Sequence, residues 1–206
     1  MVRPSVPFAL LSLALSSLLG SPALGAPFEL DPAQSTVTFE AHQAIFGDTV
    51  GTFHRFDAEL DLDRDDVRQS SLVVRIEAAS VDTGNEDRDE HLRKPDFFHV
   101  DAHPEIRFVS TRVEPRPGGA TVYGRLEVKD RRTEVRLPLD LKWSSADGRL
   151  GVRARGTVEV DRYALGLDYD TPFFIPEISR LIELRVDARA SRPLGATTST
   201  AGASAD

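Results

Sequence analysis

An all-β fold of about eight antiparallel strands is predicted by three features of the sequence. First, apolar and charged residues alternate with a period of two along many segments. In residues 133–142, for example, Val135, Leu137, Leu139 and Leu141 alternate with mainly charged residues. Second, the alternating segments are separated by turn-forming sequences, among them DRDD, PRPGG and SADG. Third, almost no long segment has the period of a helix.

Eight segments carry this alternation, and each one has an apolar face and a charged face. Such strands are typical of an antiparallel sheet that is solvated on one side only. The segments lie at residues 37–41, 58–62, 72–78, 106–109, 122–128, 133–142, 151–161 and 182–188. The spacing alone fits either a β-sandwich or a closed barrel.

Small residues on the inward faces favour the barrel. Ala78, Gly124, Ala154 and Gly156 take inward positions, where they leave space inside. An eight-stranded barrel is just wide enough to hold one small ligand, so an open apolar lumen with an apolar ligand is one interpretation. The other interpretation is a solid core, in which the inward side chains fill the lumen and the protein is an interaction module. Pro138 lacks an amide donor and predicts an edge or a bulge in its strand.

One short helix is predicted around residues 85–94, within the charged segment DTGNEDRDEHLRKPDFF. Thr83 and Glu86 have the spacing of a capping box, and Asn85 offers a second cap. Acidic residues fill the first turn and basic residues the last turn, as the helix dipole favours. Pro95 ends the helix, because the residue before a proline avoids the helical region. Capping therefore explains the order of the charges without any catalytic role.

The two ends of the chain differ in composition from the part between them. Residues 1–25 have the order of a secretory signal peptide: one arginine, an apolar run (FALLSLALSSLL) and small residues before Gly25. That run is too short to span a bilayer. We therefore expect a signal peptide at 1–25, one barrel domain at 26–190 and a flexible polar tail at 191–206. The mature chain is then periplasmic or secreted, and without a transmembrane segment.

Composition excludes several functions. The chain has no cysteine, so disulfides, a lipoprotein anchor and thiol catalysis are excluded. Its formal charge is −8, and it becomes −9 when the signal peptide with Arg3 is removed. An acidic chain repels phosphate backbones, so nucleic acid is not expected as a partner.

Catalytic and metal-binding patterns are few. His99, Asp101 and His103 would project together from an extended chain, and two imidazoles with a carboxylate suit zinc. A metal-dependent enzyme that uses these three residues is therefore an alternative hypothesis. We nevertheless expect no catalytic residue, metal or cofactor. The three candidate ligands share one exposed loop, and the sequence shows no surrounding residues that would hold them in place. His42 is expected to be buried and hydrogen-bonded rather than catalytic.

Long motifs of this chain resemble the YceI family of secreted, lipocalin-like proteins. The opening segment FELDPAQSTVTFEAH and the next strands, VGTFHRFDAELDLD, are similar to those of the family. So is the central segment IEAASVDTGNEDRDEHLRKPDFFHVDAHPEIRFVST, together with the later VYGRLEVKDRRTEVRLPL and VEVDRYALGL. The resemblance implies an eight-stranded antiparallel lipocalin-like barrel whose lumen holds a long isoprenoid, such as a polyprenol or a quinone tail. It implies transport, storage or sequestration of that lipid rather than catalysis, commonly by a homodimer.

The resemblance also implies which residues contact the lipid. They are the aromatic positions of the matching motifs, with His42 as a polar contact: Phe39, Phe53, Phe56, Phe97, Phe98 and Phe108. The family often has a histidine where this chain has Gln34, and other residues at the positions of His99 and His103. A second aromatic group fits either a lid over the barrel mouth or ordinary core: Tyr163, Tyr169, Phe173 and Phe174.

Overall fold

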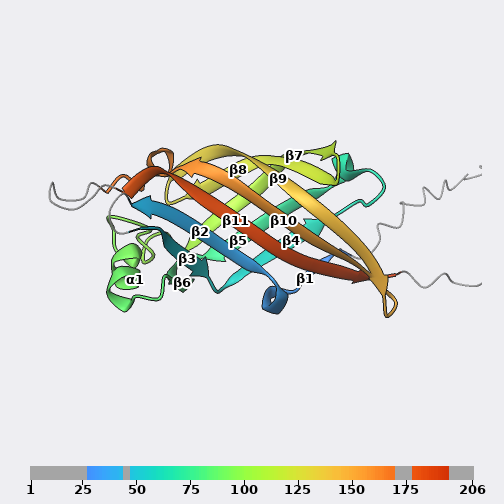
Figure 1. The fold of residues 1–206 in the computed structure, drawn as a ribbon, viewed down its shortest axis with the longest axis horizontal. Coiled ribbons are helices and arrows are strands. Elements are labelled where there is room, and N and C mark those ends of the chain that lie inside the picture. Colours follow the sequence, from blue (N-terminus) through green and yellow to red (C-terminus); the bar gives the residue numbers. More distant parts are fainter. Residues whose placement is uncertain (1–26, 44–46, 170–177, 195–206) are drawn as a thin grey trace, which may run out of the picture.

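One curled antiparallel sheet makes up most of the computed structural model, which describes residues 27–43, 47–169 and 178–194 (Figure 1). The described residues contain eleven strands and one α-helix. The strands are β1 (Glu29–Leu30), β2 (Thr36–Gln43), β3 (Thr49–Phe53), β4 (Phe56–Asp61), β5 (Ser71–Glu77), β6 (Val81–Asp82), β7 (Glu105–Arg116), β8 (Gly119–Val128), β9 (Arg131–Ala146), β10 (Arg149–Asp161) and β11 (Ile178–Pro193). The helices are the α-helix α1 (Glu86–Arg93) and the short 3-10 helices η1 (Pro32–Gln34), η2 (Val67–Gln69), η3 (Ala78–Ser80) and η4 (Arg162–Leu165).

The strand order explains how eleven strands form the predicted eight-stranded barrel. The sheet runs β4-β5-β7-β8-β9-β10-β11-β2-β3-β6, and β1 pairs with β11. Only two residues separate β3 from β4, and only η3 separates β5 from β6. Each pair is therefore one bent strand, and the bent strands join the two ends of the order. With β1 set aside, eight strands remain, as the sequence predicts.

The barrel is also bridged near its first strand. The backbone N–H of Phe28 donates to the carbonyl oxygen of Leu60 in β4 over 3.1 Å. Because β1 pairs with β11, this bond brings β4 against the β1–β11 side of the sheet. Among the described residues, no helix is long and apolar enough to cross a membrane.

Pro138 lies where two strands separate. The ladder between β9 and β10 ends at the pair Leu139 and Gly156, while β9 stays paired with β8 through Pro138. The predicted edge is therefore confirmed on the β10 side. A Cβ on Gly156 would lie 2.3 Å from the carbonyl oxygen of Pro138. Gly156 thus permits a close approach of two backbones, and the prediction that it leaves space in the lumen is wrong.

The helix α1 confirms the predicted helix, and Asn85 is its cap. The Asn85 Oδ1 atom accepts a hydrogen bond of 3.0 Å from the backbone N–H of Arg88. Thr83 does not cap the helix, because its N–H and hydroxyl both donate to Asp89, over 2.9 and 2.6 Å. Arg93 at the last turn donates to carbonyl oxygens of η3 and β6, at Ala79 and Val81. These bonds fix α1 at one end of the barrel (Figure 1).

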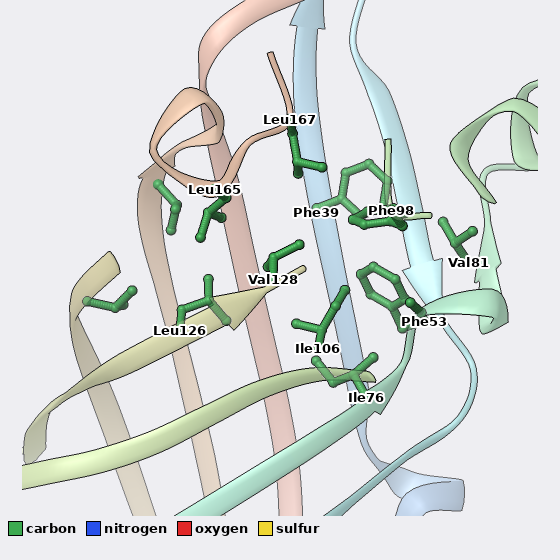
Figure 2. Close-up of a cluster of buried hydrophobic side chains, with 13 residues drawn as sticks. Phe39, Phe53, Ile76, Val81, Phe98, Ile106, Leu126, Val128, Leu165 and Leu167 are labelled. Atoms are coloured by element: carbon green, nitrogen blue, oxygen red, sulfur yellow. The ribbon is translucent and has the colours of Figure 1, made fainter. Parts of the chain in front are cut away.

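The apolar core follows the inner wall of the barrel. At the α1 end, side chains from several strands, η4 and the segment after α1 converge, and Figure 2 shows ten of them labelled. Ala78 is 1% exposed within this cluster, so it serves close packing, and the prediction that it leaves space is wrong. A second cluster around Phe28 and Val152 closes the other end. Between the two ends the inward side chains leave open space.

Candidate functional site

Two cavities lie inside the barrel, one behind the other. The first, of about 320 Å³, lies at the α1 end. The second, of about 190 Å³, extends towards the opposite end. Val37, Ile76, Leu126 and Leu184 line both cavities, so these four side chains lie where the two cavities meet. The cavities contradict the hypothesis of a solid core.

Aromatic rings form much of the first cavity. Phe39 of β2 and Phe53 of β3 have ring centroids 5.7 Å apart, and Phe53 is also 5.7 Å from Phe98, which follows α1. Figure 2 shows these three rings grouped on one side of the cluster. Leu165 in η4 lines the cavity away from these rings, and Leu167 after η4 lies beside Phe39 and Phe98. Elements far apart in the sequence thus build one apolar wall.

Polar residues of the first cavity come from the strand ends, α1 and the η4 region at one end of the barrel. They are Gln43, Thr49, Arg88, His91, Arg162 and Tyr169. The side chains of Gln43 and Thr49 make no hydrogen bond within the described residues. Because Ala41 pairs with Thr49, Gln43 and Thr49 lie diagonally across β2 and β3 on the inward face. In the described part of the chain, this end of the lumen therefore carries hydrogen-bonding side chains without a partner.

Arg162 is a buried cation that organises the same end. It is 4% exposed and forms no ion pair among the described residues. Its guanidinium donates to the carbonyl oxygens of Ile178 and Ser179 in β11, each over 3.1 Å, and to that of Leu167. A buried charge needs such acceptors. Arg162 therefore joins η4 to the start of β11 and supports the cavity wall.

His91 lies at the cavity between two aromatic rings. Its ring centroid is 5.0 Å from that of Phe97 and 5.1 Å from that of Tyr169, both in edge-on geometry. Its Nε2 atom lies 3.2 Å from the Asp96 carboxylate. The hydrogen bond with His91 holds the pKa of the Asp96 carboxyl below its usual range. Tyr169 thus lines the first cavity at the α1 end, while Phe173 and Phe174 lie outside the described residues.

The second cavity is almost entirely apolar. Asp63 and Ser70 are its polar lining residues, and neighbouring backbone groups satisfy both. The Asp63 carboxylate accepts from the N–H groups of Asp66 and Asp65, each over 2.8 Å, which holds its pKa low. The Ser70 hydroxyl accepts from the N–H of Asp63 over 2.9 Å. Trp143 lies in the lining of this cavity, 5.8 Å from the ring of Phe28. Such a dry surface suits apolar ligand groups.

The structure brings six of the seven predicted contact residues to the lumen. The first cavity is lined by Phe39, Phe53, Phe97 and Phe98, and the second by Phe56 and Phe108. That these rings contact a ligand stays a prediction.

His42 is the exception. It has the opposite parity to Phe39 and Ala41 in β2, so its side chain points outwards, where it is 70% exposed and paired with Asp48. The expectation that His42 is buried is wrong, and the structure places it outside both cavities. Gln34 is also exposed, and bonds to Asp31 and Arg189.

The segment that carries His99, Asp101 and His103, called the histidine loop below, does not have the predicted extended conformation. The N–H groups of Ala102 and His103 both donate to the carbonyl oxygen of His99, over 3.0 and 2.9 Å, so residues 99–103 form a turn. His103 lies 3.7 Å from Asp130 and not beside Asp101. The rings of His99 and His103 have centroids 5.5 Å apart. In the part of the chain that the structure describes, no three histidine or acidic residues are grouped to hold a metal ion.

Sequence reasoning missed other lining residues. Trp143 has the same parity as Leu139 and Leu141 in β9, so the period-two pattern contained a signal for it. No comparable pattern identified Arg162, because its role depends on carbonyl groups of β11 that are distant in the sequence.

The fold and the lumen define a lipocalin-like barrel protein with a hollow apolar interior. A model of the YceI-like domain matches residues 28–190, and the chain belongs to this family. A UPF0312 protein of Photorhabdus laumondii is 30% identical over 167 residues, which cover 77% of this chain and 87% of the relative.

Solved structures have the same fold. BcnA of Burkholderia cenocepacia superposes with a TM-score of 0.69 at 21% identity, over 78% of this chain and 99% of BcnA. A polyisoprenoid binding domain from Saccharophagus degradans superposes with a TM-score of 0.61 at 13% identity, over 81% of this chain and 98% of that domain. At these identities the comparison concerns the fold alone.

Proposed function

We propose that this protein is an exported binding protein that holds a long-chain isoprenoid lipid, such as a polyprenol or a quinone-like lipid, in the barrel lumen. The observation that carries the proposal is the pair of apolar cavities in series inside one barrel. The similarity in fold to a domain described as polyisoprenoid binding supports the same ligand class. The bound lipid would be transported, stored or sequestered, and no chemical step is required of the protein.

The energetics of the lumen favour a long tail. Burial of each methylene group contributes about 0.8 kcal/mol, so the affinity rises with the length of tail that the lumen encloses. Asp63 and Ser70, the polar lining residues of the second cavity, are already hydrogen-bonded, so a tail without polar atoms leaves no group unpaired there.

The polar residues set the orientation of the lipid. Gln43, Thr49 and His91 gather at the α1 end, whereas the second cavity has an almost wholly apolar lining. An amphiphilic lipid therefore places its head group at the α1 end and its tail towards Trp143. The signal peptide at 1–25, a periplasmic or secreted location and a homodimer complete the proposal.

Uptake of a long polyprenol tests this function. Ile182 lines the first cavity, whereas its neighbour Leu181 is 48% exposed on the outer face. The protein is incubated with solanesol, separated from free lipid by gel filtration and assayed by mass spectrometry. We expect wild type and Leu181→Trp to retain solanesol, and Ile182→Trp to retain at least about tenfold less because the indole fills the lumen. The proposal fails if wild type retains none, or if a folded Ile182→Trp variant retains as much as Leu181→Trp.

A further inference from the structure

We infer that the lumen selects lipids by the length of their tail, because the second cavity accepts only the part of a tail that extends beyond the first. This inference rests on the proposed function and concerns the same lumen. It depends on the serial arrangement of the two cavities, on the small residues that keep each one open, and on the distance that they span together.

Small residues keep the second cavity open. Ala154 of β10 and Ala188 of β11 are directly opposite each other in the ladder, and both line this cavity. In β8, a Cβ on Gly124 would lie 2.4 Å from the Cζ atom of Phe108. The ring of Phe108 therefore occupies the place of a side chain at Gly124 and lies against the wall. A larger residue at Ala154 or Ala188 would project into the open space.

The first cavity has the same arrangement. Phe39 and Gly51 are partners in the β2–β3 ladder, and a Cβ on Gly51 would lie 2.3 Å from the Cζ atom of Phe39. The glycine thus allows the Phe39 ring to lie flat on the wall. The width of each cavity therefore depends on its own glycine–phenylalanine pair. A substitution can consequently block one cavity and leave the other open.

The distance spanned by the two cavities exceeds one ordinary acyl tail. Ile178 lines the first cavity and Ala190 the second, and both belong to β11. At about 3.3 Å per residue and a strand tilt of about 40°, this stretch extends roughly 30 Å along the barrel axis. A bilayer core of about 30 Å holds two lipid tails end to end, so one acyl tail extends only about 15 Å. A short tail is thus accommodated by the first cavity, and a polyprenyl tail reaches the second.

A fluorescent side chain lies in the second cavity and can report whether a lipid tail reaches it. Trp143 is the only tryptophan of the chain, and it lines the second cavity but not the first. A tail that reaches the second cavity places apolar groups against the indole and changes its emission. A tail that ends in the first cavity leaves the emission unchanged.

Two isoprenoid alcohols of different length test the inference, farnesol as the short probe and solanesol as the long one. Lipid uptake is measured by mass spectrometry and occupancy of the second cavity by Trp143 emission. We expect wild type to take up both lipids, solanesol with the higher affinity because more of its tail is buried, and we expect only solanesol to shift the emission. In Ala188→Leu, the affinity for solanesol should fall at least about tenfold while that for farnesol changes less than about twofold. Ala33→Leu, at an exposed position in η1, is the control and should match wild type.

The outcomes separate this inference from the proposed function. If wild type takes up both lipids and both shift the Trp143 emission equally, tail-length selection is overturned, and this readout requires no variant. Equal weakening of both lipids in a folded Ala188→Leu protein overturns it as well. If wild type takes up neither lipid, the proposed function itself fails and the inference falls with it.

Discussion

At the scale of the residue, the width of the lumen depends on pairs of small and aromatic side chains. Phe39 and Phe53 are only 8% and 5% exposed, yet they line an open cavity, because their rings lie along the wall rather than across the lumen. Gly51 makes this possible for Phe39, since a Cβ there would overlap the ring. The glycine is thus required by a neighbouring side chain and not by its own backbone angles.

The contact between Gly51 and Phe39 predicts that one substitution weakens lipid binding and that a second substitution restores it. Gly51→Ala should push the Phe39 ring into the first cavity and lower the affinity for solanesol by about tenfold or more, at a cost in stability of roughly 1–3 kcal/mol from overpacking. The double variant Gly51→Ala/Phe39→Leu removes the clash, and its affinity should return to within about threefold of wild type. Binding is measured by retention of lipid after gel filtration, and folding by circular dichroism. If the folded double variant binds as poorly as Gly51→Ala, the proposed role of the pair is incorrect.

At the scale of the element, ion pairs on the outer face connect the long strands. Asp187 of β11 accepts two hydrogen bonds from Arg153 of β10, over 2.7 and 2.5 Å, and one of 3.0 Å from Arg155. The hydrogen bonds from Arg153 hold the pKa of the Asp187 carboxyl below its usual range. The contribution of this group to stability is therefore fully present above its unfolded pKa of about 3.9 and is lost as the pH falls through the lower folded pKa.

Asp187→Asn should consequently destabilise the protein at neutral pH, by about 1 kcal/mol for a partly exposed pair. At low pH, below the lowered pKa of the Asp187 carboxyl, the free energies of unfolding of variant and wild type should converge, because the wild-type carboxyl is then protonated. Urea denaturation at both pH values measures the difference. Glu159→Gln is the control, since Glu159 is exposed on the outer face of β10 and forms no ion pair in the described part of the chain. A difference that persists or grows at low pH would contradict the assignment.

The strands and the helix were predictable from the sequence to different degrees. The period-two pattern predicted all eight long strands, because one face of each meets the lumen and the other meets water. The bends at His54–Arg55 and at η3 were not predicted, since AAS carries no turn signal and the bend depends on barrel closure. For α1, the charge order predicted the helix, while the choice of Asn85 over Thr83 depended on the buried carboxylate of Asp89.

The functional site was predictable where the alternation of residues along a strand decides which side chains face the lumen. Phe39 and Phe53 point into the lumen, and parity within β2 also carried the signal that His42 points outwards. Parity could not show that the histidine loop folds into a turn, or that Gly51 lies opposite Phe39. Those facts depend on turn geometry and strand register, which local spacing does not determine.

At the scale of the whole molecule, the barrel is an apolar container with one polar end. The α1 end carries the polar lining residues, and the opposite end is closed by the cluster around Phe28 and Val152. A container of this kind suits an amphiphilic lipid with a long tail, and the export of the chain stays a prediction from residues 1–25. Membership in the YceI-like domain family agrees with a binding role.

The most direct test of the central claim is the lipid content of the protein as it is isolated from its own cells. The protein is purified from the native host without added lipid and extracted with organic solvent, and the extract is quantified by mass spectrometry. We predict about one long-chain isoprenoid per chain, and at least about tenfold less in the extract of a folded Ile182→Trp protein isolated in parallel. An extract without any apolar lipid, together with a lumen that takes up no added solanesol, would contradict the account.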